Sequence, residues 1–157
     1  MVFWVYNILF SFILLLGLLL FPLVFLFGRR VWEGFWERMG VYPRNLTHAL
    51  QGSRPIWVHA ASVGEVRAAT PLVRQIKAKY PERKILVSSV TRAGKRTAWE
   101  MEAGVDGVVY FPLDHPWVIR RALRLIDPCL FVFLETEIWP NFLRLAFDRG
   151  IPTMMLS

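Results

Sequence analysis

Short apolar runs alternate with longer amphipathic runs over most of the chain. The apolar runs predict five buried strands, at Pro55–His59, Lys84–Thr91, Val108–Pro112, Cys129–Leu134 and Ile151–Leu156. The amphipathic runs predict helices at Glu65–Ile76, Thr97–Ala103, Pro116–Ile126 and Asn141–Asp148. Strands that alternate with helices indicate an α/β domain with a parallel sheet and right-handed crossovers, which we place over residues 55–157.

The first 28 residues carry no charged side chain, and Ile8–Phe27 is almost wholly apolar. A spanning helix needs about 20 such residues, so we expect a transmembrane anchor over residues 1–28. A cleaved signal peptide would instead place positive charge before a shorter apolar core. Here Arg29 and Arg30 follow the apolar run, and the positive-inside rule places the rest of the chain in the cytoplasm.

Four large apolar residues recur at helical spacing after the anchor: Trp32, Phe35, Trp36 and Met39. Charged residues lie between them, so Arg29–Gly40 is predicted to form an amphipathic helix. Two interpretations of this helix remain open. It lies at the bilayer interface, or it packs on the domain, and one helix could do both. Tyr42–Arg54 is predicted to be a linker, so residues 29–54 separate the anchor from the domain.

The chain has 157 residues, with 19 Lys and Arg against 12 Asp and Glu, and a net charge of +7. This basic excess aids solubility, attracts an anionic membrane leaflet or binds an acidic substrate. Nucleic-acid binding is a less favoured explanation of the basic excess, because no nucleic-acid motif accompanies the charge. The single cysteine, Cys129, excludes an internal disulfide, and no His or Cys cluster has the spacing of a metal site.

The stretch Pro55–Glu65 joins the first predicted strand to the first predicted helix through mostly small residues. Such residues let the backbone turn tightly and let a ligand approach. Open parallel sheets bind ligands beyond the carboxyl ends of their strands, at helix N-termini. The loops Ala60–Glu65 and Glu135–Trp139 both leave the carboxyl ends of strands, so we expect them to share one rim of the sheet.

The motifs ERMGVY, HAASVGE, SSVTRAG, FPLDHP and ETEIWPN follow one another between Glu37 and Asn141. In kind and order they resemble those of the 3-deoxy-D-manno-octulosonic acid (Kdo) transferases. The resemblance implies the Rossmann-like N-terminal (acceptor) domain of a GT-B glycosyltransferase. In that family a second Rossmann-like domain holds the nucleotide sugar, and the resemblance covers only the front half of such a chain. We therefore expect the fragment alone to be inactive.

The resemblance also implies a reaction, which is the transfer of Kdo from CMP-Kdo to a lipid A precursor in lipopolysaccharide synthesis. The anomeric carbon would be inverted, with no cofactor and no bound metal. The acceptor is a bisphosphorylated lipid, which accounts for both an anchor and a basic excess. We therefore expect a single-pass protein of the inner membrane with its catalytic domain in the cytoplasm.

Two glutamates are the catalytic candidates. Ser62 and Glu65 match a capping box, in which Ser62 caps a helix and Glu65 reaches back to the Ser62 amide. The resemblance instead makes Glu65 the general base. It makes Glu135 a second catalytic carboxylate that stabilises the transition state. Glu135 and Glu137 would otherwise be solvated residues that favour the next helix N-terminus, although a charge beside a buried strand is costly.

The remaining candidates are substrate-binding residues on the same rim: His59, Ser62, Gly64, Arg92, Gly94, Lys95 and Glu137. Arg92–Arg96 is predicted to be a basic loop that seats an acceptor phosphate, or else a solvated turn. His59 is equally consistent with a structural hydrogen bond. A different class of function stays open as well. The chain is then a non-catalytic, membrane-tethered module that binds an anionic lipid or a partner.

Overall fold

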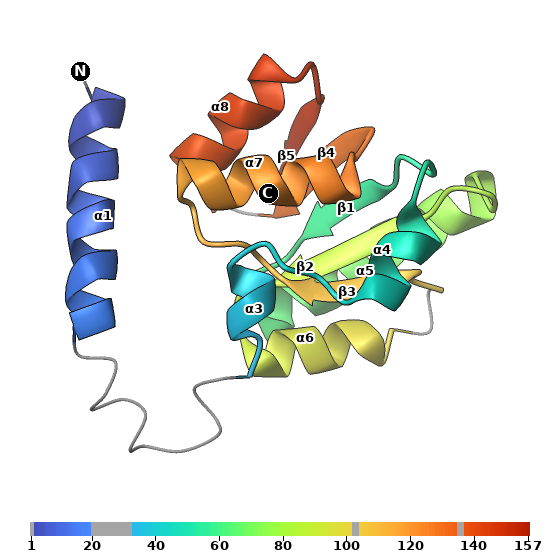
Figure 1. Ribbon diagram of the computed structural model, residues 1–157. Helices are drawn as coiled ribbons and strands as arrows, with labels where there is room; N and C mark the ends of the chain where they lie inside the picture. Colours follow the sequence, from blue (N-terminus) through green and yellow to red (C-terminus); the bar gives the residue numbers. More distant parts are fainter. Residues whose placement is uncertain (1, 20–32, 102–103, 135–136) are drawn as a thin grey trace.

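A five-stranded parallel sheet forms the centre of the computed structural model, which describes residues 2–19, 33–101, 104–134 and 137–157 (Figure 1). The strands lie in the order β3-β2-β1-β4-β5, and every neighbouring pair is parallel. Their bounds are β1 (Ile56–His59), β2 (Ile85–Ser89), β3 (Gly107–Tyr110), β4 (Leu130–Leu134) and β5 (Thr153–Leu156). The predicted α/β class and all five predicted strands are confirmed.

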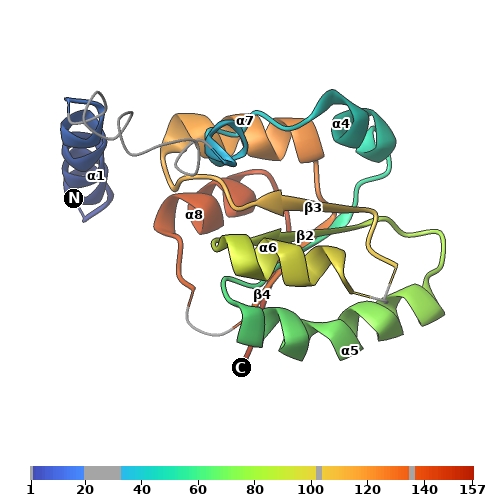
Figure 2. The same ribbon diagram turned by 90° about the horizontal axis from the view of Figure 1, so that it is seen from below.

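Helices cover both faces of this sheet (Figure 2). The helices are α1 (Val2–Leu19), α3 (Phe35–Arg38), α4 (Arg44–Leu50), α5 (Val63–Lys79), α6 (Arg92–Trp99), α7 (Pro116–Ile126) and α8 (Pro140–Asp148). Helices α5 and α6 pack on one face, and α4, α7 and α8 pack on the other. Because both faces are covered, the inner strands are continuous apolar runs rather than alternating ones, up to the polar residues His59, Ser88 and Ser89 at their carboxyl ends.

The central strand β1 divides its side chains between the two layers. Ile56 and Val58 pack in the core beneath α5 and α6, whereas Trp57 packs in the core beneath α7 and α8. Trp57 is fully buried, and its ring lies edge-on to Phe131 and Phe142, with centroids 5.9 and 5.3 Å away. This aromatic cluster fixes the position of β1 in the core, and with it the position of the carboxyl end of the strand.

The order of the strands creates a switch point between β1 and β4. From β1 the chain winds outward through β2 to β3, and α7 then returns it to β4 on the other side of β1. The connections that leave β1 and β4 therefore run in opposite directions, and open α/β sheets bind ligands at such a point. The predicted shared rim of the two loops is confirmed, since β1 and β4 pair in parallel with His59 opposite Phe133.

Two predicted loops contain helices. The predicted basic loop Arg92–Arg96 is wrong, because helix α6 begins at Arg92 and ends at Trp99. The Thr91 hydroxyl caps it by accepting from the Gly94 amide at 3.0 Å. The predicted linker holds helix α4, whose Leu50 is buried in the main core. Few apolar residues mark this helix in the sequence, and Pro43 precedes it instead of ending an element.

The N-terminal helix differs from the predicted anchor. Helix α1 has 18 residues and includes Tyr6 and Asn7, which precede the predicted span. Among the described residues, no helix combines the length and apolar character needed to cross a bilayer. The predicted span Ile8–Phe27 is therefore not found in the described part of the chain, and residues 20–27 lie outside it. The predicted amphipathic helix over residues 29–40 is reduced to α3, and residues 29–32 lie outside the described part too.

Polar contacts join α1 to the domain. The Tyr6 hydroxyl donates to Asp114 Oδ2 at 2.9 Å, and the Asn141 side-chain amide donates to Asn7 Oδ1 at 2.8 Å. Asp114 is fully buried and also accepts from the backbone amides of Asn141 and Phe142, at 3.0 and 2.8 Å. One carboxylate thus satisfies the N-terminus of α8 and binds the first helix.

Candidate functional site

The candidate site lies at the switch point, where β1 ends and α5 begins. Ser62 has extended backbone angles and caps α5, with its hydroxyl accepting from the Glu65 amide at 3.3 Å. This places Glu65 in the first turn of a 17-residue helix, where the helix dipole favours negative charge. The predicted strand, turn and helix are confirmed, and they carry the site.

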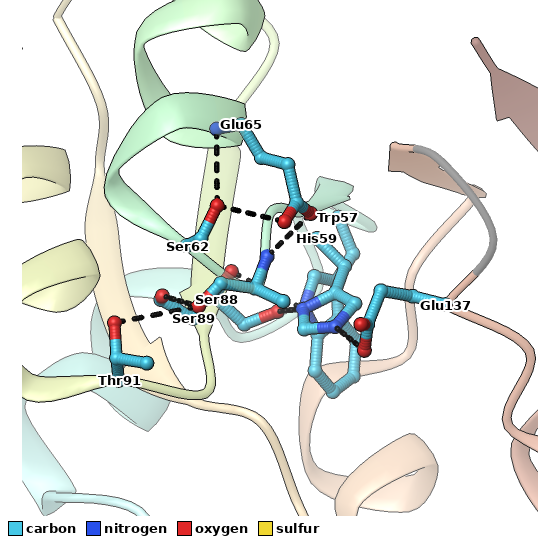
Figure 3. A network of polar contacts seen from close by, with 9 residues as sticks. Trp57, His59, Ser62, Glu65, Ser88, Ser89, Thr91 and Glu137 are labelled. Carbon is cyan, nitrogen blue, oxygen red and sulfur yellow. Dashed lines mark hydrogen bonds and ion pairs between the residues drawn. The ribbon is translucent and has the colours of Figure 1, made fainter.

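Both carboxylate oxygens of Glu65 are held in place (Figure 3). Oε2 accepts from the Ala61 amide at 2.8 Å, and Oε1 accepts from the Ser62 hydroxyl at 2.8 Å. The capping box is therefore present, but Glu65 reaches the Ala61 amide rather than the predicted Ser62 amide. Each oxygen accepts one bond, and a carboxylate oxygen has two lone pairs. The side chain is thus oriented and still able to accept another proton donor.

His59 ends β1 and lies beneath this turn. Its side chain is fully buried and stacks on Phe111 with ring centroids 4.0 Å apart. Nδ1 lies 3.0 Å from Ser88 Oγ, while Nε2 has no hydrogen-bond partner among the described residues. The ring is fully buried in this structure, which favours the structural alternative for His59.

Glu137 approaches the same histidine from the loop after β4. Its Oε2 lies 3.9 Å from His59 Nε2, which is an ion-pair distance and too long for a hydrogen bond (Figure 3). His59 lowers the pKa of Glu137, and burial opposes this effect. The Glu137 side chain is about one-third exposed, so it remains accessible to solvent. Glu135, the other predicted carboxylate of this loop, lies outside the described residues.

The predicted phosphate-binding cations have acidic partners. Lys95 donates to both oxygens of Glu37 at 2.7 Å, and Arg92 lies 3.1 Å from Glu33. Lys95 is largely buried in this pair, whereas the Arg92 side chain is two-thirds exposed. Arg92 is therefore the more accessible cation of the two. The sequence did not reveal either partner because each glutamate lies more than 50 residues before the cation that it pairs with.

The two predicted glycines differ in their surroundings. Gly64 is exposed, and a side chain there would meet only Ser62 Oγ at 3.8 Å, so a ligand has room to approach. Gly94 is buried, and a Cβ would collide with the hydroxyls of Ser89 and Thr91. Gly94 thus serves the packing of α6 onto β2, whereas Gly64 leaves the N-terminus of α5 open.

Ser88 was not predicted as a residue of the site, and Trp139 lies beside the site as well. Ser88 accepts from the indole of Trp57 at 2.8 Å and contacts His59, so it links the core to the site. Trp139 follows Glu137 and packs on Phe111, with ring centroids 5.4 Å apart. Paired serines at the end of an otherwise apolar strand were the available signal for Ser88. Among the described residues, no group of His, Cys, Asp or Glu is arranged to hold a metal ion.

Comparison with known proteins decides the family. The family model described as 3-deoxy-D-manno-octulosonic-acid transferase (Kdo transferase) matches residues 33–157. The chain belongs to the Kdo transferase family. The match covers the sheet, both loops of the switch point and α3, so the predicted resemblance is confirmed.

Curated members of the family align with the same region. The 3-deoxy-D-manno-octulosonic acid transferase of Haemophilus influenzae is 39% identical over 121 residues, which are 77% of this chain and 28% of that protein. The enzymes of the same name from Chlamydophila psittaci and Bordetella pertussis are 36% and 32% identical, over 68% and 66% of this chain. This chain spans about a quarter of the length of these Kdo transferases.

Proposed function

We propose that this chain is the acceptor domain of a GT-B enzyme that transfers Kdo from CMP-Kdo to a lipid A precursor, with inversion. The observation that carries the proposal is the Glu65 carboxylate, fixed at the switch point by the Ala61 amide and the Ser62 hydroxyl. The family match supports the sugar transferred. The donor would bind a second domain, and the reaction would need both domains together.

In this proposal Glu65 is the general base. It accepts the proton of the acceptor hydroxyl while that oxygen attacks the anomeric carbon of Kdo and the CMP leaves. A general base must lie within hydrogen-bond reach of its proton, and a positioned carboxylate with free lone pairs meets that need. The open surface at Gly64 supports the approach of a bulky acceptor to this carboxylate. Glu135 is proposed as a second carboxylate that stabilises the transition state.

The acceptor is proposed to be an anionic lipid presented at the cytoplasmic face of the inner membrane. Helix α1 supports this location, because Trp4, Ile8 and Phe12 are each more than 60% exposed on it. Its polar residues Tyr6 and Asn7 turn instead toward the domain. The net charge of +7 suits both a phosphorylated acceptor and an anionic leaflet. The exposed guanidinium of Arg92 is the proposed phosphate contact.

The test of the proposal is Glu65→Gln, made in a polypeptide that includes the second domain implied by the family. Glutamine keeps the shape of the side chain and can still accept from the Ala61 amide, but it cannot take up a proton. We expect an unchanged melting temperature and a turnover lower by about 10²–10⁴-fold. Product is measured as CMP-Kdo-dependent modification of the lipid acceptor.

Glu82→Gln is the matched control, because Glu82 is exposed in the turn before β2, at the far end of the sheet. It should alter neither stability nor turnover. Normal turnover by Glu65→Gln would show that Glu65 serves only as a helix cap and that the proposed mechanism is wrong. Turnover that falls together with the melting temperature would assign the defect to folding.

A further inference from the structure

The buried ring of His59 has one nitrogen with a hydrogen-bond partner and, among the described residues, one without. Nδ1 lies 3.0 Å from the Ser88 hydroxyl and 3.2 Å from the Ser88 carbonyl. Nε2 is buried without a hydrogen-bond partner among the described residues. Buried polar atoms rarely lack a hydrogen-bond partner, so we expect Nε2 to have one.

The groups around the imidazole favour one position for the proton on His59. The Trp57 indole can only donate, so its 2.8 Å contact makes Ser88 Oγ an acceptor. The Ser88 carbonyl already accepts from the Ala60 amide at 2.9 Å. Nδ1 can either accept the Ser88 hydroxyl proton or donate to Ser88, and the Glu137 carboxylate beside Nε2, which can only accept, favours the first arrangement. A neutral imidazole with an accepting Nδ1 carries its own proton on Nε2.

The Nε2 proton is aimed at Glu137. The distance from Nε2 to Glu137 Oε2 is 3.9 Å, and Glu137 lies on the loop that leaves β4 at the switch point. Stacking on Phe111, at 4.0 Å between centroids, holds the imidazole plane in this direction (Figure 3 shows the ring between Ser88 and Glu137). A small movement of the partly exposed Glu137 carboxylate toward Nε2 would convert this contact into a hydrogen bond.

We propose that His59 is a positioning residue, which uses its Nε2–H to hold Glu137 ionised and oriented as the acceptor for a sugar hydroxyl of the substrate. The chain of contacts runs from the indole of Trp57 through Ser88 to His59 and then to the carboxylate. His59 acts through Glu137 and does not touch the substrate. The role of Glu137 rests on the proposed function, whereas the state of His59 does not. The lowered pKa of Glu137 agrees with this arrangement.

The contacts that run from Trp57 through Ser88 and His59 to Glu137 form a relay. The first experiment measures this relay, on the 157-residue chain in detergent micelles. Nitrogen-15 shifts of the histidine rings report which nitrogen of His59 is protonated, and carbon-13 shifts report the titration of Glu137. We expect the Nε2–H form and a Glu137 midpoint below the ordinary value of a glutamate. An Nδ1–H form in the wild-type chain would overturn the proposal.

Ser88→Ala is the decisive variant because it leaves the imidazole in place. Without the hydroxyl, Nδ1 is expected to take the proton and donate to the Ser88 carbonyl, which leaves Nε2 unprotonated. The Glu137 midpoint should then rise. His59→Phe keeps the stacking on Phe111 and should raise the Glu137 midpoint similarly. An unchanged midpoint in a folded Ser88→Ala protein would overturn the relay even if His59→Phe does not fold.

The second experiment follows transfer activity in the polypeptide with both domains. We expect Ser88→Ala to raise the KM for the lipid acceptor by about tenfold or more, through a weakened hydrogen bond to a charged group, and to change kcat less. Glu65→Gln should show the opposite split. An unchanged KM would remove Glu137 from substrate binding. If no variant of Glu65 alters turnover while the nitrogen-15 result holds, the proposed function fails and the relay stands.

Discussion

The Lys95 ammonium donates to both oxygens of the Glu37 carboxylate, at 2.7 Å each, across 58 residues of sequence. The same carboxylate accepts from the Tyr110 amide at 2.8 Å. Lys95 and Arg38 lie on the Tyr110 ring, 4.4 and 4.3 Å from its centroid. These contacts dock the short helix α3 onto β3 and α6, which favours packing on the domain over the bilayer interface for the described part of residues 29–40.

Glu37→Gln should therefore destabilise the domain. The glutamine can still accept from the Tyr110 amide, but it leaves the largely buried Lys95 charge without its anion. We expect a loss of about 1–3 kcal/mol in the free energy of unfolding, measured by chemical denaturation. Glu100→Gln is the control, since its pair with Arg96 is exposed and should contribute nothing measurable. Equal effects of the two substitutions would contradict the docking role of Glu37.

Asp106 should make the stability of the domain sensitive to acid. Burial by itself raises the pKa of Asp106, but hydrogen bonds from Lys77, the Ile85 amide and Lys84 outweigh it, and the net shift is downward. A lowered pKa in the folded state means that the unfolded chain binds the proton more tightly. The stabilisation is present above the unfolded pKa, near 4, and is lost as pH falls through the folded value.

The measurement is urea denaturation at several pH values between about 7 and 3. Asp106→Asn should be less stable than the wild type at neutral pH, and the difference should shrink as the pH approaches 3. Asp148→Asn provides the control, because Asp148 is exposed and its nearest cation, Arg144, is 3.9 Å away. A constant difference across the pH range would mean that the charge of Asp106 is not what stabilises the fold.

The two glycines near the site should respond oppositely to alanine. At Gly94 a Cβ would collide with the Ser89 and Thr91 hydroxyls, so Gly94→Ala should cost about 1–3 kcal/mol in the free energy of unfolding. At Gly64 the space is open and the backbone is helical, so Gly64→Ala should be neutral or slightly stabilising. Thermal unfolding of the two variants decides the matter. A stable Gly94→Ala protein would show that α6 can move away from β2.

Local patterns in the sequence determined most of the fold. Helix α7 was predicted with both of its ends, because a strong apolar stripe lies between a proline that starts a helix and the Asp127–Pro128 stop. The five strands and their parallel pairing follow from continuous apolar runs separated by helices. Helix α4 was missed because its apolar residues are too few to form a stripe. Its stability comes from burial of Leu50 in the main core.

The site was predicted only as far as neighbours in sequence define it. Ser62 and Glu65 are three residues apart, so the local sequence pattern is enough to predict their capping contact. Whether His59 touches substrate or lies buried under Phe111 was decided by the packing of β1 between two layers of helices. The partners of Lys95, Ser88 and Glu137 were decided in the same way. Each lies 29 or more residues from its partner, and only the tertiary structure brings such groups within 4 Å of each other.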